Sequence, residues 1–160
     1  MATIATTNEV IESAVIRAPL SNVWHFLKIG EFDKFWPALK SCEPVKGYID
    51  EANVTQWTYQ DDTIVNVKLD EHSSIDHFIT YSIITAEPSL GYSSVTNTIR
   101  CWPVTHGELE NSTFVRWSSK FSSDAGIEVI EDAKYKRREA LSYLSVAAMH
   151  MATARQEHQK

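Results

Sequence analysis

The sequence predicts an α+β fold in which a curved antiparallel sheet packs around one long helix near the C-terminal end. Residues 127–160 contain neither Gly nor Pro, which predicts a continuous helix. Residues 41–121 instead form short segments rich in β-branched and aromatic residues, with turn-forming residues between them. A sheet that curves around a single helix tends to leave a hollow between the two layers. The pattern therefore favours the binding of an apolar small molecule.

The segment before the predicted sheet should hold one strand and two short helices. Residues 9–17 are rich in Val and Ile, which predicts a first strand. Pro19 suits the first turn of a helix over residues 20–27, since its missing N–H would be unpaired there in any case. A second short helix is expected over residues 31–35. It should stop before Pro37, because the residue that precedes a proline is disfavoured in the helical region.

Six further strands are expected, separated by pairs of Asp, Ser, Pro and Gly residues that favour turns. They cover residues 41–47, 53–59, 63–71, 77–86, 92–104 and 112–121. Alternate side chains of a strand point to opposite faces of the sheet. In these segments one register is apolar with a few polar groups and the other is mostly polar, which is typical of a sheet with one buried face. The apolar register should face the helix.

The apolar register and the helix supply the predicted ligand-binding residues. A small-molecule site is usually an apolar pocket with a few well-placed hydrogen-bonding groups. Such groups here are Asn97, Ser119, Cys101 and the polar tips of Tyr81 and Trp117, although Tyr and Trp are equally common as core residues. Asn97 is the most informative, because a buried amide needs partners. The side chains expected around an enclosed apolar space are Val67, Tyr81, Ile83, Val95, Asn97, Ile99, Trp117, Ser119, Arg137 and Leu141.

The long helix is expected to run from about residue 124 to about residue 154, or ~45 Å at 1.5 Å per residue. Ser123 should cap it, because a serine oxygen can accept from the unpaired amides of the first turn. Either of two possible apolar stripes places Arg137 on or beside the apolar face. There its guanidinium could pair with a ligand carboxylate at the cavity mouth. Alternatively it could extend into water, which we favour.

Composition narrows the class of protein. The formal net charge of −6 argues against a nucleic-acid or anionic-membrane surface, and no apolar stretch approaches membrane-spanning length. Two cysteines, Cys42 and Cys101, favour a reduced intracellular protein over a disulfide scaffold, and the N-terminal segment lacks the features of a signal peptide. We therefore expect a cytoplasmic protein with one domain over residues 1–160 and its core at about 8–155. It should be a monomer or a weak dimer.

Residues that would carry catalysis or metal binding are sparse. The six histidines show no metal-ligand spacing, and no nucleophile-elbow or nucleotide-binding motif is present. His72 and His77 flank a turn and should be solvated. Cys101 lies in a strand-like segment without a neighbouring base, so we expect a buried, unreactive thiol. The sequence predicts no cofactor and no metal, and it assigns no catalytic residue.

The order of these elements resembles the SRPBCC superfamily, which includes the START and Bet v 1-like helix-grip proteins, and in particular its polyketide cyclase/dehydrase branch. The resemblance covers about residues 8–155. It rests on Ala18-Pro19 with Val23-Trp24, the Glu-Phe-Asp-Lys-Phe-Trp-Pro segment at residues 31–37, Val-Lys-Leu-Asp-Glu at 67–71, Thr-Tyr-Ser-Ile at 80–83 and Val-Arg-Trp at 115–117. The resemblance implies a seven-stranded antiparallel sheet that grips the final helix, with an apolar cavity between them.

The resemblance also implies which residues catalysis would need. In lachrymatory-factor-synthase-like relatives, the chemistry depends on an Arg and a Glu on neighbouring strands. The matching positions here are Gln56 and Val67, neither of which is a cation or a general acid or base. A shift of a few residues in the alignment would instead bring Asp70 or Glu71 to the carboxylate position. The departure from the family pattern argues against the same isomerase-like chemistry.

Two functions from different classes remain. The first is binding or transport of a small hydrophobic ligand, such as a lipid, isoprenoid, polyketide or aromatic metabolite. The second is a cofactor-free cyclase, dehydratase or isomerase, which would need a titratable group with a shifted pKa in the cavity. The inward register offers Tyr81 and Cys101 but no clear Asp, Glu or His, so binding is favoured. A ligand-regulated interaction module would also need a gating loop, for which residues 87–92 are the candidate.

Overall fold

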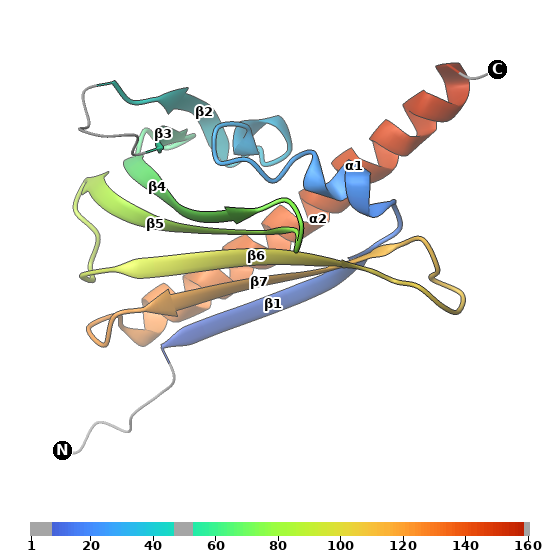
Figure 1. Ribbon diagram of the computed structural model, residues 1–160. Coiled ribbons are helices and arrows are strands. Elements are labelled where there is room, and N and C mark those ends of the chain that lie inside the picture. The colour runs from blue at the N-terminus through green and yellow to red at the C-terminus, as the bar shows by residue number, and fades with distance from the viewer. Residues whose placement is uncertain (1–7, 47–52, 159–160) are drawn as a thin grey trace.

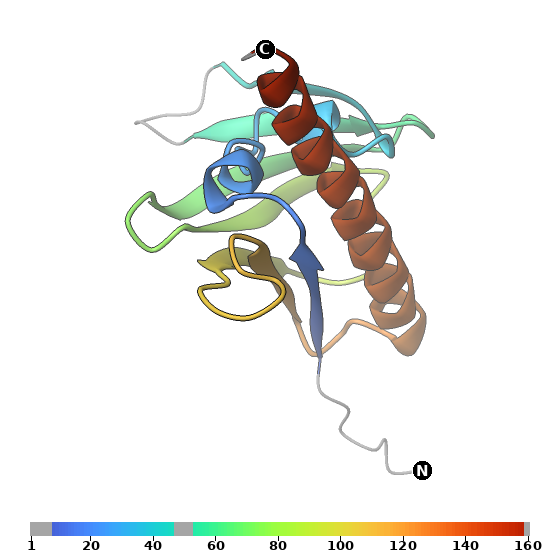
Figure 2. The ribbon, with the colours of Figure 1, turned by 90° about the vertical axis from the view of Figure 1, so that its right-hand side faces the viewer.

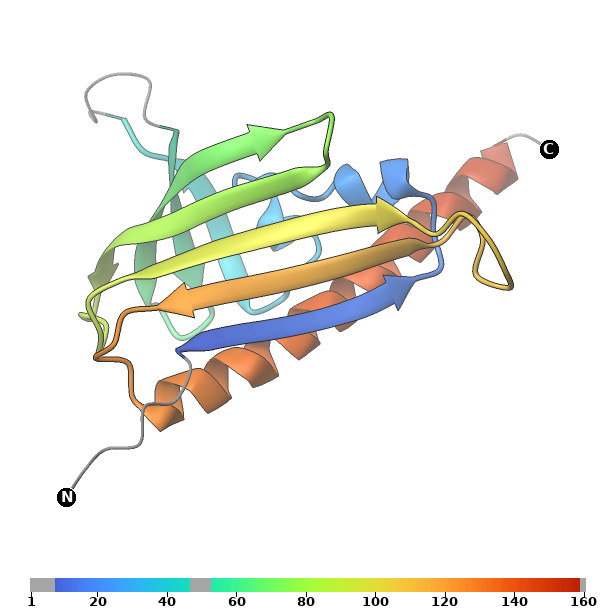
Figure 3. The ribbon, with the colours of Figure 1, turned by 60° about the horizontal axis from the view of Figure 1, so that its bottom comes forward.

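A computed structural model describes residues 8–46 and 53–158 of the protein (Figure 1). One antiparallel sheet contains seven strands in the order β1-β7-β6-β5-β4-β3-β2. The long helix α2 runs along one face of this sheet, as the views in Figures 2 and 3 show. The elements are β1 Glu9–Ile16, α1 Leu20–Trp24, a 3-10 turn Phe32–Lys34, β2 Leu39–Pro44, β3 Val54–Tyr59, β4 Ile64–Ser73, β5 Phe78–Glu87, β6 Val95–Pro103, β7 Thr113–Phe121 and α2 Ile127–His158.

The predicted helix-grip fold class is confirmed, and most boundaries agree within three residues. The strand predicted over residues 41–47 begins earlier, at Leu39, and ends at Pro44, and its expected end at Gly47 lies outside the described residues. The strand predicted from residue 92 begins at Val95. The helix predicted over residues 20–27 ends at Trp24. The chain after it is held instead by Trp57, whose indole Nε1 donates to the Ile29 carbonyl over 2.7 Å.

The prediction that Ser123 caps the long helix is wrong. Helix α2 begins at Ile127, and the carbonyl of Gly126 accepts its first hydrogen bonds, from the amides of Val129 at 3.1 Å and Ile130 at 3.2 Å. Ser123 is exposed and lies in a turn in which the Ala125 amide donates to the Ser122 carbonyl. The helix also continues past the expected end at residue 154, to His158. The capping preference of Ser123 therefore does not set the start of the helix, because the preceding turn makes tertiary contacts instead.

Aromatic side chains fill the centre of the space between sheet and helix. Phe32 follows α1 in the chain, and its ring lies 5.0 to 5.9 Å from three other buried rings. Those rings belong to Trp57, Tyr81 and Trp117. Trp36 adds a further edge-on contact with Trp117. These rings therefore occupy part of the enclosed space expected in front of the middle strands.

Several of the predicted inward side chains lie within this packed core. Val67, Ile99 and Trp117 are fully buried and belong to the main cluster around the aromatic rings. Val95 belongs to a second cluster near the start of α2, with Val10, Phe121, Ala125, Ile130 and Ala133. The inward direction predicted from strand alternation is thus confirmed, and these residues pack closely against their neighbours, while their role in lining an enclosed ligand space stays a prediction.

The described residues contain no helix long and apolar enough to cross a membrane. Within the same ranges, no three His, Cys, Asp or Glu side chains are grouped so as to hold a metal ion. Both cysteines are free thiols. Burial raises the pKa of Cys101 to about 12, which agrees with the prediction of an unreactive thiol. A cytoplasmic location stays a prediction.

Candidate functional site

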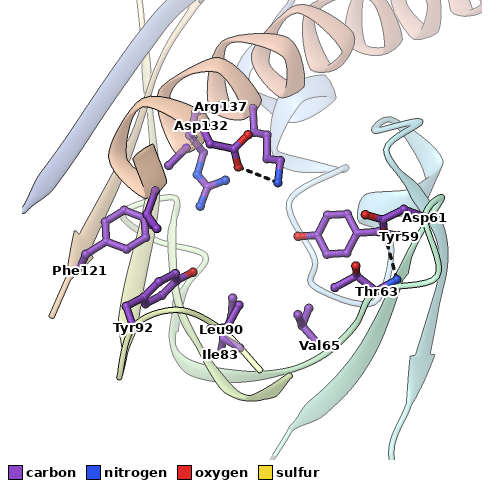
Figure 4. Close-up of a pocket in the computed structure, with 13 residues that line it drawn as sticks. Tyr59, Asp61, Thr63, Val65, Ile83, Leu90, Tyr92, Phe121, Asp132 and Arg137 are labelled. Atoms are coloured by element: carbon purple, nitrogen blue, oxygen red, sulfur yellow. Dashed lines mark hydrogen bonds and ion pairs between the residues drawn. The ribbon is translucent and has the colours of Figure 1, made fainter. Parts of the chain in front are cut away.

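A pocket opens between the first turns of α2, the β3–β4 turn and the loop that joins β5 to β6 (Figure 4). Its volume is about 210 Å³. Apolar side chains form much of its wall, with charged groups on α2 and one, Asp61, on the β3–β4 turn. The lining residues are Tyr59, Asp61, Thr63, Val65, Ile83, Leu90, Tyr92, Phe121, Val129, Asp132, Ala133, Lys136 and Arg137.

The β3–β4 turn places Tyr59 in this pocket. The Asp61 carboxylate accepts a hydrogen bond from the Thr63 amide over 3.0 Å, and the Tyr59 amide donates to the Thr63 carbonyl over 2.8 Å. Asp62 takes the left-handed backbone conformation that such a tight turn requires, with φ of 68°. The Tyr59 hydroxyl points into the pocket (Figure 4). Burial raises the pKa of Tyr59 to about 12, and the nearby positive charge of Arg137 acts in the opposite direction.

The loop between β5 and β6 forms the opposite wall and is anchored to the turn before α2. The Asp124 carboxylate accepts from both the amide and the hydroxyl of Ser93, and also from the hydroxyl of Ser122. The Ser122 hydroxyl oxygen accepts from the amides of Ser93 and Ser94 at 3.1 and 3.0 Å. This anchoring fixes Tyr92, whose ring packs against Phe121 at the pocket wall. The loop over residues 87–92 stays a candidate gate.

The anchor should depend on pH. Hydrogen bonds from Ser122 and Ser93 lower the pKa of Asp124 to about 2, from an ordinary value of 3.8. A depressed folded-state pKa means that the stabilisation is complete above about 3.8 and is lost as the pH falls through about 2. We expect Asp124→Asn to lower stability in denaturant unfolding at pH 7, and the difference from wild type should shrink as the pH falls from 4 towards 2. A difference that stays constant with pH would contradict this role of the carboxylate.

Arg137 lies at the base of the pocket and is bonded to the sheet. Its Nη2 donates to the Asn97 side-chain oxygen over 3.0 Å, and its Nε donates to the Ser119 hydroxyl over 3.2 Å. The guanidinium carbon lies 5.3 Å from the centre of the Trp117 ring. The favoured prediction that this arginine extends into water is therefore wrong, because a polar cross-strand pair on β6 and β7 receives its head.

The structure brings together only some of the predicted ligand-binding residues. Ile83 and Arg137 line the pocket, and Asn97 and Ser119 lie next to Arg137. Leu141 is buried further along α2, at a shallow groove beside β1. The others, Val67, Tyr81, Val95, Ile99 and Trp117, lie in the packed clusters. A ligand-binding role for each stays a prediction.

Sequence reasoning missed most of the wall. Tyr59 and the loop residues Leu90 and Tyr92 stand at strand ends or outside strands, where alternation says nothing about direction. Val129 and Ala133 face the pocket from the first turns of α2. Their spacing of four residues was the available signal, since it puts both on one helix face.

The positions matched to a family Arg–Glu pair do not form a catalytic site here. Gln56 is half-buried and pairs with Asn66 on β4, and Val67 is fully buried. Asp70 and Glu71, which an alignment shift would substitute, are both exposed and do not line the pocket. The structure therefore places no carboxylate from β4 beside Arg137.

The prediction that His72 and His77 are simple solvated loop residues needs correction. His72 lies on β4 and is exposed, whereas His77 is half-buried. Both rings contact Trp24 of α1, with ring centres 5.4 and 5.3 Å from it. The two imidazoles thus hold α1 against the β4–β5 hairpin.

A second hollow of about 630 Å³ lies between the β3–β5 strands and the segment after α1. Leu27, Ile29, Leu69 and Ile79 supply its apolar wall. Its rim includes Pro44 and Asn53. We take the Arg137 pocket as the candidate site, because Ile83 and Arg137 line it and Asn97 and Ser119 lie next to Arg137.

Solved structures share this fold. One is a protein from Bacillus thuringiensis, with 20% identity and a TM-score of 0.74, and the match covers 88% of this chain and 98% of that one. Another is XoxI from Bacillus cereus, with 19% identity and a TM-score of 0.74, and the match covers 91% of this chain and 99% of that one. A third is the di-domain ARO/CYC StfQ from the steffimycin biosynthetic pathway, with 20% identity and a TM-score of 0.72, and the match covers 91% of this chain and 46% of that one. The chain spans about half of StfQ. These identities establish a common fold and nothing further.

A family comparison covers most of the chain. No curated protein matches the sequence. A family model described as polyketide cyclase / dehydrase and lipid transport matches residues 7–139, from before β1 into the part of α2 that carries Arg137. The match agrees with the seven-stranded sheet and long C-terminal helix. The chain belongs to this polyketide cyclase/dehydrase and lipid transport family, within the SRPBCC superfamily.

Proposed function

We propose that the protein binds a small, mainly apolar molecule in the Arg137 pocket and acts as a binding protein or carrier. The observation that carries the proposal is the convergence of apolar side chains from β4, β5, β7, α2 and the β5–β6 loop on one hollow. Val65, Ile83, Leu90 and Phe121 belong to this wall. A mainly apolar hollow with a few polar groups is the usual form of a small-molecule site. The family includes lipid transport in its description.

The dimensions of the pocket limit the ligand. Its volume of about 210 Å³ is below the range of ~300–1,000 Å³ typical of sites for drug-sized ligands. A molecule with one or two rings, or a short branched chain, suits this volume better than an extended two-chain lipid. The hydroxyls of Tyr59 and Tyr92 face the hollow (Figure 4) and can donate hydrogen bonds to such a ligand.

A cofactor-free cyclase, dehydratase or isomerase is the second candidate. Arg137 faces a hollow that also contains Tyr59 and Tyr92, and a cation there could stabilise an enolate oxygen in a transition state. Burial, however, raises the pKa of both tyrosines, so they stay protonated near pH 7 and are weak general acids. Turnover of a polyketide substrate, lost by orders of magnitude in Tyr59→Phe, would favour the enzyme over the carrier.

Filling the pocket should weaken binding. Ala133 lies in the wall on α2, and Ala133→Leu would place an isobutyl group in the hollow while keeping a good helix former. Excluding about 60 Å² of apolar ligand surface at ~25 cal/mol/Å² corresponds to about 1.5 kcal/mol, or roughly tenfold in Kd. We therefore expect about tenfold weaker binding of both trans-cinnamate and its neutral analogue trans-cinnamamide in titration calorimetry.

The matched control is Ser142→Leu, which adds the same side chain to an exposed position of α2 outside this pocket. It should bind both compounds as the wild-type protein does. If a folded Ala133→Leu variant also keeps wild-type affinity, or if neither compound binds the wild-type protein, the proposed site is wrong.

A further inference from the structure

The base of the pocket is rich in hydrogen-bond donors and poor in acceptors. Asn97 is 1% exposed, and its side-chain oxygen already accepts from Arg137 and from the Ser119 hydroxyl, the latter over 2.5 Å. Its amide nitrogen has no partner among the described residues. A buried donor without an acceptor is unfavourable, because it has lost its hydrogen bonds to water. Asn97 does not itself line the pocket; it positions the Arg137 guanidinium, which does.

The charge of Arg137 is likewise without a counter-ion. In the ranges that the structure describes, no carboxylate oxygen lies within 4.0 Å of its guanidinium nitrogens, since the ion pairs there involve other cations. The neighbouring Lys136 is neutralised by Asp132 at 2.9 Å. A partly buried cation is stable only when polar groups or an anion compensate its lost hydration. Asn97 and Ser119 contribute neutral oxygens, which leaves the charge itself unmatched.

Tyrosine hydroxyls complete the surroundings of the guanidinium. Burial raises the pKa of Tyr59, Tyr81 and Tyr92, and in each case the positive charge of Arg137 acts in the opposite direction. All three hydroxyls therefore lie within electrostatic range of Arg137. Figure 4 shows those of Tyr59 and Tyr92 pointing into the hollow that the guanidinium enters. Protonated hydroxyls and a guanidinium together match an oxyanion.

We propose that the ligand of this pocket is a small carboxylic acid with an apolar body. Its carboxylate pairs with Arg137, and its apolar part lies against the wall that contains Val65, Ile83 and Leu90. This inference rests on the proposed function, because it specifies the ligand class of the same site. Two carboxylates, Asp61 and Asp132, also line the pocket, and the Asp132 charge is paired with Lys136. The ligand acid therefore belongs at the Arg137 side.

The test compares trans-cinnamate with trans-cinnamamide, which differ in charge at one end and little in shape. Calorimetric titration of the full chain at pH 7 should give an affinity for cinnamate at least about tenfold higher than for cinnamamide, since hydrogen bonds to charged groups are the stronger ones. Arg137→Gln should remove this preference and leave cinnamamide binding within about threefold of wild type. Arg138→Gln is the control, because it removes the same charge from the next, exposed position, which pairs with Glu12.

A second variant tests the charge without shortening Arg137. Asn97→Asp keeps the shape of the side chain and puts a carboxylate against the guanidinium, in the place of an amide that bonds it over 3.0 Å. This internal anion should compete with the ligand, so cinnamate affinity should fall at least about tenfold while cinnamamide affinity changes little. Thermal melting of each variant identifies any that fails to fold, and Asn97→Asp serves if Arg137→Gln does not fold.

The outcomes separate this inference from the proposed function. Equal affinity for the two compounds in the wild-type protein, or an unchanged preference in both folded variants, would overturn the acid-binding inference and leave apolar binding in place. Weaker binding of both compounds by about tenfold in Ala133→Leu, with cinnamate preferred in the wild type, supports both. Binding that Ala133→Leu does not affect would overturn both.

Discussion

Replacing Phe32 by alanine should lower the free energy of unfolding by about 3–5 kcal/mol, the range typical of a large aromatic side chain removed from a core. Phe32 is fully buried, and its ring contacts four other aromatic rings. These belong to Phe35, Trp57, Tyr81 and Trp117, at centre distances of 5.0 to 5.9 Å. The rings come from three separate strands and the segment after α1, so the cavity left by the substitution cannot close by a local shift. Urea unfolding monitored by far-UV circular dichroism measures the change.

The control for Phe32→Ala is Ile127→Ala. Ile127 is 72% exposed at the start of α2, and a surface substitution of this kind is expected to change stability by no more than about 0.5 kcal/mol. A loss below about 1 kcal/mol in Phe32→Ala would mean that the aromatic rings do not pack as a unit. The filled interior, and with it the placement of the ligand pocket at one end of α2, would then be wrong.

The sheet was predictable because the alternation of apolar and polar residues along a strand can be read directly from the sequence. In β6 and β7 the residues at every second position are buried, as the apolar register indicated. The pairing of Asn97 with Ser119 across these strands then follows from the antiparallel register. The same regularity made Arg137 visible as a residue beside the apolar stripe of the helix. The local periods of strand and helix thus sufficed for the fold and for part of the pocket base.

The filled centre was not predictable from those periods. Phe32 and Trp36 follow α1 in short, irregular segments, where no repeating pattern indicates which way a side chain points. Both turn inward and occupy the space that the strand pattern alone left empty. The candidate pocket lies towards the start of α2, where its wall includes Leu90 and Tyr92 of a loop. Loop conformations depend on tertiary contacts, here the bonds of Ser93 to Asp124.

The start of α2 was likewise not predictable from local sequence preference alone. Ser123 has the side chain of a good helix cap, but the preceding turn uses Ser122 and Asp124 to hold the β5–β6 loop. The helix therefore begins after Gly126. The helix thus begins three residues later than predicted, and the turn before it fixes one wall of the ligand pocket in place. Capping preference is worth about 1 kcal/mol, which several tertiary hydrogen bonds can outweigh.

Replacing Leu144 by alanine should lower the free energy of unfolding by about 2–5 kcal/mol without altering the ligand pocket. Leu144 is fully buried in the middle of α2, on the same face as Ala140 and Ala148, which are also fully buried. The small alanines on either side let the helix approach the sheet closely, so Leu144 supplies a large part of the apolar contact along this stretch. Val146, 66% exposed on the opposite side of the helix, is the matched control. Val146→Ala should change stability by no more than about 0.5 kcal/mol.

Ligand titration separates the two roles of α2 in this variant. Leu144 is not among the residues that line the pocket, whereas Arg137, two turns earlier, is. We therefore expect Leu144→Ala, measured well below its lowered melting temperature, to bind trans-cinnamate with wild-type affinity. Arg137→Gln should lose that affinity in the folded state. If Leu144→Ala weakens binding as much as Arg137→Gln does, the pocket depends on the position of the whole helix, and the specific contact of Arg137 with the ligand is not needed to explain the preference.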